Sequence, residues 1–144
     1  MKRFSLEDCI EQGLLRRIAP SASAAESSLK TSERWLEEAE KGLKAGAYNS
    51  SVMSSYLAMF HSARAVLFRD GIREKSHYCV SRYLEKYVKE GRLEGKWVAL
   101  LDYSQELRHD SRYDAVFITS EKEAGQSLGT AREFVERIKA LVVG

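Results

Sequence analysis

The strongest hydrophobic pattern in the chain lies between residues 47 and 71, near the middle of the sequence. Its apolar residues recur three or four positions apart, as on one face of an α-helix: Val52, Tyr56, Met59, Phe60, Ala63, Val66 and Leu67. Asn49 or Ser50 is a suitable N-cap, and Gly71 can adopt the left-handed conformation that ends a helix. A helix of about six turns is long for a globular protein. We therefore expect other helices to cover its apolar face.

The same spacing predicts further helices on both sides of this central one. The expected helices cover residues 5–17, 22–45, 47–71, 76–90, 93–113 and 120–142. Pro20, the only proline, separates the first two, and Ser76 is a plausible N-cap for the fourth. Ser120 and Glu123 have the spacing of a capping box at the start of the last. Short connections between successive helices favour antiparallel neighbours.

Strict alternation of apolar and polar residues, the pattern of a β-strand, is not convincing anywhere in the chain. We therefore predict an all-α fold, an antiparallel up-and-down helical bundle of four long helices plus short flanking helices. We expect residues 1–144 to form a single domain, in which residues 1–19 provide an extra N-terminal helix. Residues 114–119 are too short and unpaired to form a sheet, and we expect an irregular crossing there.

The composition excludes several classes of protein. Cys9 and Cys79 are the only cysteines, and they lack the spacing of a metal site or a disulfide framework, so we expect two buried, reduced thiols. We expect no metal and no cofactor. No apolar run approaches the length of a membrane helix, and the N-terminus lacks the apolar core of a signal peptide. These features predict a cytoplasmic protein that is not inserted in a membrane.

The charge is nearly balanced, with 23 basic and 21 acidic residues. This balance excludes a strongly basic tail for nucleic-acid binding but does not exclude a local basic patch. Residues 48–113 hold 11 basic and 8 acidic residues and are the mildly basic part. Ordinary scatter of surface charge explains so small an excess better than a phosphate-binding surface does.

Two segments together resemble a known family. Residues 40–68 contain the turn Gly-Ala-Tyr-Asn followed by Ser-Tyr-Leu-Ala-Met-Phe-His-Ser-Ala-Arg-Ala, and this pair of helices resembles the signature of HEPN domains. The similarity continues at Ser76-His77 and at Glu106-Leu107-Arg108, which Tyr113 follows after four residues. It covers roughly residues 29 to 142 and leaves only the first helix outside.

The resemblance implies a bundle of about four long helices that commonly forms a homodimer. Many HEPN domains are metal-independent ribonucleases, and prokaryotic forms often pair with a minimal nucleotidyltransferase as toxin and antitoxin. Their catalytic signature is Arg-x(4–6)-His, and Arg108-His109 fits its first half. The expected histidine is missing here, because Tyr113 stands in its place, as is usual in the branch that this chain most resembles.

The chemistry of RNA cleavage defines the candidate site. A ribose 2′-OH must lose a proton as it attacks phosphorus, which suits a histidine, and the crowded phosphate charge suits an arginine. We expect the catalytic residues to be Arg108, His109 and Tyr113, and the nucleotide or phosphate to be bound by Arg108, Arg112 and His77. An acid such as Asp102 or Asp110 should lie near the stacked arginines.

Two functions remain open from the sequence. The first is an RNA-acting toxin component of a HEPN/nucleotidyltransferase toxin–antitoxin pair, a metal-independent ribonuclease. The alternative is a catalytically inactive module that binds nucleotides or proteins, which the missing histidine favours. A cluster of Arg108, His109 and Arg112 also suits the negative end of a helix dipole without any function. His61 is best explained as a structural histidine, and Tyr78, Tyr83 and Tyr87 as core and interface residues.

Overall fold

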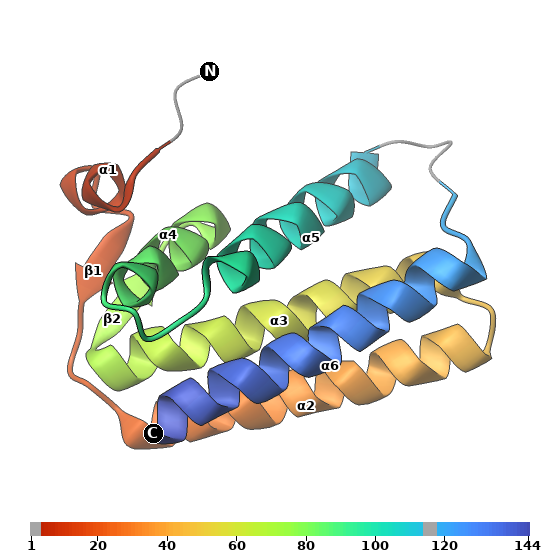
Figure 1. The fold of residues 1–144 in the computed structure, drawn as a ribbon, viewed down its shortest axis with the longest axis horizontal. Coiled ribbons are helices and arrows are strands. Elements are labelled where there is room, and N and C mark those ends of the chain that lie inside the picture. The colour runs from red at the N-terminus through yellow and green to blue at the C-terminus, as the bar shows by residue number, and fades with distance from the viewer. Residues whose placement is uncertain (1–3, 114–117) are drawn as a thin grey trace.

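The structure is a computed structural model, which describes residues 4–113 and 118–144, except for the side chains of residues 108–113. The helices are α1 (Leu6–Glu11), α2 (Ala22–Lys44), α3 (Tyr48–Asp70), α4 (His77–Lys89), α5 (Gly95–Tyr113) and α6 (Glu121–Val143). The strands are β1 (Leu15–Arg17) and β2 (Ile72–Glu74). Figure 1 shows α2, α3 and α6 lying side by side, with α4 and α5 across one side of α3. The predicted all-α helical bundle is confirmed.

Helix α3 forms the centre of the bundle, as its long apolar face predicts. It packs against α2, α4, α5 and α6, and thirteen of its residues are buried. Gly71 ends it in the left-handed conformation, with φ of 78°. The predicted N-cap is wrong, because Ala47 occupies that position without a side-chain hydrogen bond. The side-chain oxygen of Asn49 accepts instead from the backbone N–H of Thr119, 3.1 Å away, and so ties the start of α6 to α3.

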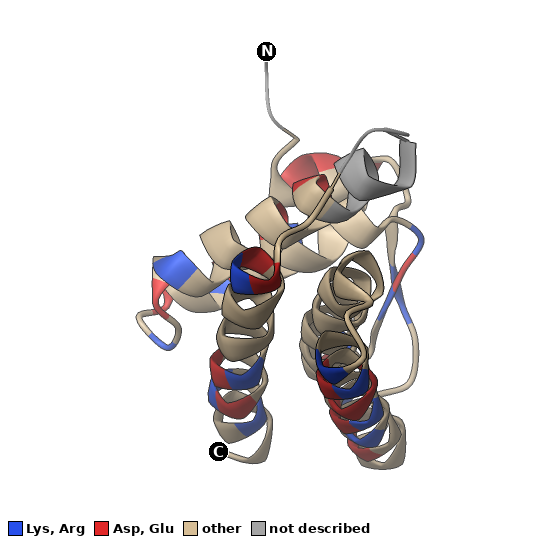
Figure 2. Cartoon of the chain, turned by 90° about the vertical axis from the view of Figure 1, so that its right-hand side faces the viewer, with Lys and Arg blue, Asp and Glu red and all other residues tan. Residues whose placement is uncertain are grey.

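Helices α2 and α6 pack along α3 and carry most of their charge on the outside. Figure 2 shows Lys and Arg interspersed with Asp and Glu along both helices. Two ion pairs join them across the surface, Arg132 with Glu40 at 3.2 Å and Lys139 with Glu33 at 3.2 Å. Exposed pairs of this kind add little stability. The intermixed signs are those of a solvated surface rather than of a patch of one charge.

The two short strands were not predicted. The first helix ends at Glu11, so Arg16 and Arg17 lie in an extended strand rather than in its last turn. Strand β1 pairs antiparallel with β2, with Arg16 opposite Arg73. Three residues are too few to show alternation, and the partner strand is more than fifty residues away, so the pairing depends on the packing of the helices.

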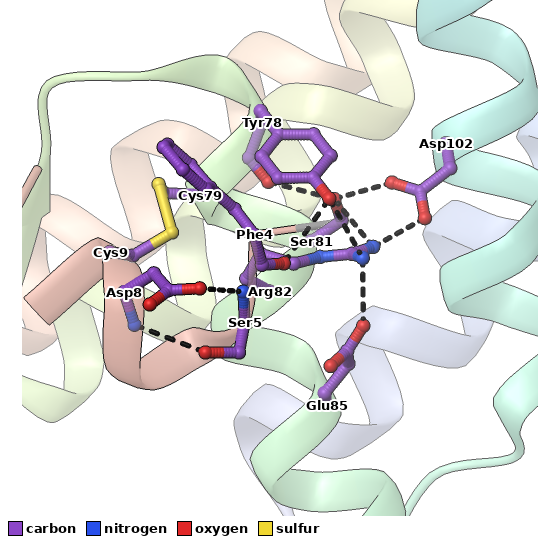
Figure 3. Close-up of polar contacts among 10 residues, drawn as sticks. All are labelled: Phe4, Ser5, Asp8, Cys9, Tyr78, Cys79, Ser81, Arg82, Glu85 and Asp102. Carbon is purple, nitrogen blue, oxygen red and sulfur yellow. Dashed lines mark hydrogen bonds and ion pairs between the residues drawn. A yellow bond between two sulfur atoms is a disulfide. The ribbon is translucent and has the colours of Figure 1, made fainter. Parts of the chain in front are cut away.

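The prediction that the cysteines are reduced and separate is wrong for this structure. Cys9 of α1 and Cys79 of α4 form a disulfide, and both are fully buried. Figure 3 shows the bond joining the two helices, beside the capping box that Ser5 and Asp8 form at the start of α1. A pair of cysteines seventy residues apart has no local spacing that signals a disulfide. The bond attaches the N-terminal segment to the helix that begins at His77.

Other predicted boundaries agree with the structure. Ser120 and Glu123 form both hydrogen bonds of the capping box at the start of α6, and Gly91 has a positive φ just after α4. Ser76 is the N-cap of α4, although its side chain makes no capping hydrogen bond. The expected irregular crossing at 114–119 falls mostly outside the described residues. Among the described helices, none is long and apolar enough to cross a membrane.

Candidate functional site

His77 begins α4 and is held in place by two aromatic residues of α3. Its ring stacks on Phe60, with the ring centres 4.0 Å apart and the planes 25° from parallel. Its Nδ1 is 3.2 Å from the hydroxyl oxygen of Tyr56, close enough for a hydrogen bond in either direction. Tyr56 and Phe60 are buried, whereas His77 remains exposed. The imidazole is therefore oriented by two side chains of the core.

The predicted arginine motif lies in the last turns of α5. The backbone of Arg108, His109, Arg112 and Tyr113 is helical, but their side chains lie outside the described residues, as does that of Asp110. The sequence-based assignment of these side chains therefore stays a prediction. The position of the helix itself is defined by contacts further back along α5.

One of these contacts joins α5 to the central helix. The hydroxyl of Ser104 donates to the sulfur of Met59 at 3.5 Å. The two helices run in opposite directions (Figure 1), so the turn of α5 that begins at Arg108 continues toward the earlier turns of α3. Ser55 and Tyr56, about one turn before Met59, lie at that level. Ser55 is buried, and its hydroxyl has no hydrogen-bond partner among the described residues.

A polar network joins α5 to α4. Figure 3 shows the carboxylate of Asp102 bound by the hydroxyl of Ser81, at 2.6 Å, and by the guanidinium of Arg82. Arg82 is fully buried, pairs with Glu85 at 3.0 Å and lies against the ring of Tyr78. Asp102 was expected near Arg108 as a counter-charge, and the described contacts give it a partner on α4. The sequence signal for Arg82 was only an arginine in a tyrosine-rich helix, which did not indicate burial.

His61 has the structural environment expected of it. It is half-buried on α3, with its ring edge against Phe60. Burial, and then the positive charge of Arg64 and the nearby His77, lower its pKa below the usual value. Its imidazole is therefore neutral at pH 7.

The tyrosines of α4 also have structural partners. Tyr83 and Tyr87 are buried, and both donate hydrogen bonds to Asp70 at the end of α3. Burial favours the protonated carboxyl, but the hydroxyls of Tyr87 and Tyr83 and the guanidinium of Arg69 outweigh it and lower the pKa of Asp70. Arg69 also donates to the carbonyl of Leu141 at 2.6 Å and so holds the end of α6. This cluster closes one end of the bundle, as the core interpretation of these tyrosines predicts.

The fold is a bundle of long helices packed around α3. The sequence profile described as the HEPN domain matches residues 25–141, which is most of the chain. The protein belongs to the HEPN family. The match begins within α2, so α1 and β1 lie outside it.

Curated relatives of this chain come from archaea. A Methanocaldococcus jannaschii protein named "Putative toxin MJ0605" is 33% identical over 112 residues, which cover 72% of this chain and 83% of the relative. An Archaeoglobus fulgidus "UPF0332 protein" is 27% identical over 117 residues, covering 81% and 94%. A Pyrococcus horikoshii "UPF0332 protein PH1297" is 31% identical over 97 residues, covering 67% and 66%.

Proposed function

We propose that this protein is the toxin component of a toxin–antitoxin pair and acts as a metal-independent endoribonuclease. Family membership supports the helical scaffold, and the relative named as a toxin supports the role. The observation that carries the proposal is the imidazole of His77, which Tyr56 and Phe60 orient at the start of α4. A cation and an imidazole at one place are the groups that RNA cleavage needs.

Arg108 binds the scissile phosphate in this proposal. Its guanidinium is always charged, and its planar fork of donors matches two phosphate oxygens at once. Arg112 lies one helical turn further along α5 and adds a second positive charge to the same end of the helix. His109 and Tyr113 belong to the same segment, where Tyr113 positions the phosphate by a hydrogen bond, because a phenol with a pKa near 10 is a poor base at pH 7.

The proposal also includes two interaction partners. We propose that two copies of the chain form a homodimer that places two such arginines at one groove, where single-stranded RNA binds. A minimal nucleotidyltransferase is the proposed antitoxin. Co-expression of the two proteins should relieve growth arrest caused by this chain alone, and a partner that leaves the arrest unchanged would contradict this part of the proposal.

The test of the activity is incubation of the purified chain with single-stranded RNA in the presence of EDTA. We expect products with 2′,3′-cyclic phosphate and 5′-hydroxyl ends, and no cleavage by Arg108→Ala. Arg132→Ala is the matched control, because Arg132 is an arginine on the surface of α6 whose described partner is Glu40. RNA left intact by the wild type, or cleaved equally by Arg108→Ala, would contradict the proposal.

A second candidate function is nucleotide or protein binding without turnover. The observation that favours it is Tyr113 at the position where the catalytic signature has histidine. It predicts that calorimetry detects nucleotide binding that depends on Arg108, while RNA stays intact. Cleavage of RNA by the wild type would exclude it.

A further inference from the structure

We propose that the two-stranded sheet of β1 and β2 is a docking surface for the phosphate backbone of single-stranded RNA. The surface is formed by Arg16, Arg73 and Lys75, and we call these three residues the basic ribbon. Figure 1 shows both strands beyond the end of α3, at the opposite end of the bundle from the last turns of α5. The inference rests on the proposed function for the choice of RNA, and it names a second place at which that substrate binds.

Strand pairing brings together cations that are far apart in the sequence. Arg16 lies directly opposite Arg73 in the antiparallel register, so their side chains leave the same face of the sheet. The backbone N–H of Lys75 donates to the carbonyl of Leu14 at 2.8 Å, which continues the pairing by one position. Lys75 is two residues after Arg73 and therefore emerges on the same face. The buried Leu15 belongs to the opposite face, which packs on the rest of the protein.

The positive charges of the basic ribbon are not neutralised by the protein. All three side chains are exposed, and in the described part of the chain none of them has a carboxylate within ion-pair distance. The acid of β2, Glu74, is bound by Arg64 at 2.9 Å. Asp70, just before β2, accepts a hydrogen bond from Tyr83 at 2.8 Å. Like charges directly opposite each other destabilise a sheet, and a bound anion removes that cost.

The shape of the basic ribbon favours a chain of phosphates over a single anion. Directly opposite side chains on a sheet begin about 5 Å apart, and positions two residues apart along a strand are about 7 Å apart. Arg16, Arg73 and Lys75 therefore form a row of three cations. A guanidinium also binds two phosphate oxygens at once through its planar fork of donors.

An aromatic ring beside this row favours nucleic acid over an acidic protein. The guanidinium carbon of Arg73 is 5.8 Å from the centre of the Phe68 ring, and that of Arg64 is 5.0 Å from it. Phe68 is half-buried on α3. Unpaired bases stack on aromatic rings and on guanidinium planes. The centre of a protein interface, by contrast, is depleted of charged residues.

The basic ribbon is held in place before a ligand binds. The backbone N–H of Ile18 donates to the carbonyl of Gly71 at 2.9 Å and continues the strand pairing at its other end. The disulfide between Cys9 and Cys79 attaches α1, which precedes β1, to α4. A surface fixed in this way loses little conformational freedom on binding. The ribbon joins a strand outside the family match at 25–141 to one inside it.

The test measures binding of a single-stranded 2′-O-methyl oligonucleotide, which lacks the attacking hydroxyl and cannot be cleaved, over a range of salt concentrations. Each phosphate contact on a single strand adds about 0.7 to the slope of log affinity against log salt. We expect the double variant Arg16→Ala with Arg73→Ala to lower this slope by about 1.4 and to bind at least about tenfold more weakly at about 0.1 M salt. Arg34→Ala with Arg132→Ala is the matched control, because it removes two exposed arginines from α2 and α6. The control should bind like the wild type.

Arg73→Glu separates binding from folding. It places an acid opposite Arg16, and opposite charges at such a position stabilise a sheet. This variant should therefore bind the oligonucleotide more weakly than Arg73→Ala does, without a lower melting temperature. Weaker binding accompanied by a lower melting temperature in every ribbon variant would show that these residues act in folding, which overturns the inference.

The remaining outcomes distinguish this inference from the proposed function. Equal slopes for the wild type and the double variant, or no binding by the wild type, would overturn the inference. Poly-glutamate that binds more tightly than the oligonucleotide at the same salt would overturn it in favour of an acidic protein partner. A wild type that binds through the basic ribbon but leaves RNA intact removes only the proposed ribonuclease activity, whereas cleavage without a contribution of the ribbon to binding removes only the inference.

Discussion

Two histidines on adjoining helices of this protein have opposite environments, and the difference lies in their exposure. His61 is half-buried against Phe60 and has a lowered pKa. His77 stacks on the ring of the same phenylalanine but stays exposed. His77 is exposed but held by the buried side chains of Phe60 and Tyr56. His61 is partly desolvated, which is the environment of a histidine that packs in the core. The sequence places His61 beside Phe60 on the central helix and His77 after Ser76 at a helix start, and it does not distinguish their exposure.

The pKa of His61 predicts a pH dependence of stability. Because this pKa is lower in the folded state than in the unfolded state, the unfolded chain binds more protons below about pH 6.5. The contribution of His61 is therefore complete above that pH and is lost as the pH falls. We expect the free energy of unfolding in urea, compared at pH 7.5 and pH 5, to fall less in His61→Asn than in the wild type. An equal fall in both proteins would contradict this.

Arg82 carries a prediction about stability. Its guanidinium is fully buried and binds Asp102, whose side chain is 23% exposed. Removing one partner of a buried ion pair typically costs about 3–5 kcal/mol, and the partial exposure of Asp102 favours the lower end. We expect Arg82→Ala to lower the free energy of unfolding by about 3 kcal/mol, measured by urea denaturation. Arg132→Ala, which breaks an exposed pair, should cost less than about 1 kcal/mol. An equal loss of unfolding free energy in the two variants would contradict this, because the buried ion pair would then contribute no more than the exposed one.

At the scale of the elements, the long helices could be predicted from the sequence and the short elements could not. The apolar spacing from Val52 to Leu67 is a local property, and so is the capping box at Ser120. Strands of three residues have no period of their own, and β1 forms only because β2 lies beside it. The predicted cap at Asn49 is wrong for a similar reason, because its side-chain oxygen accepts from the backbone N–H of Thr119, far along the chain. Ala47 occupies the N-cap position instead.

The disulfide between Cys9 and Cys79 predicts how much stability is lost when the bond is removed. It closes a loop with a sequence separation of 70 and attaches α1 to α4. In the chain-entropy description, a loop of this length contributes about 4 kcal/mol to stability. We expect reduction, or Cys9→Ser, to lower the free energy of unfolding of the oxidised protein by about that amount and to speed amide exchange in α1. Thiol titration that finds two free cysteines in the folded, oxidised sample would contradict the pairing.

At the scale of the whole molecule, the helices serve to bring distant residues to one place. Ser81 and Arg82 fix α5 through Asp102, Met59 fixes it through Ser104, and both contacts precede the turn of Arg108. The arginine motif itself could be recognised from the sequence through its resemblance to the family. The packing of α5 against α3 and α4 could not, because it depends on contacts between residues far apart in the sequence.

The measurement that tests the central claim most directly is the rate of RNA cleavage in EDTA by the wild type, Arg108→Ala and the control Arg132→Ala. Loss of a donor that stabilises the charged transition state typically costs about 100-fold or more. We therefore predict a fall of at least that size for Arg108→Ala, with products ending in cyclic phosphate, and a rate for Arg132→Ala equal to that of the wild type. Equal rates for all three proteins, or intact RNA with the wild type, would contradict the account.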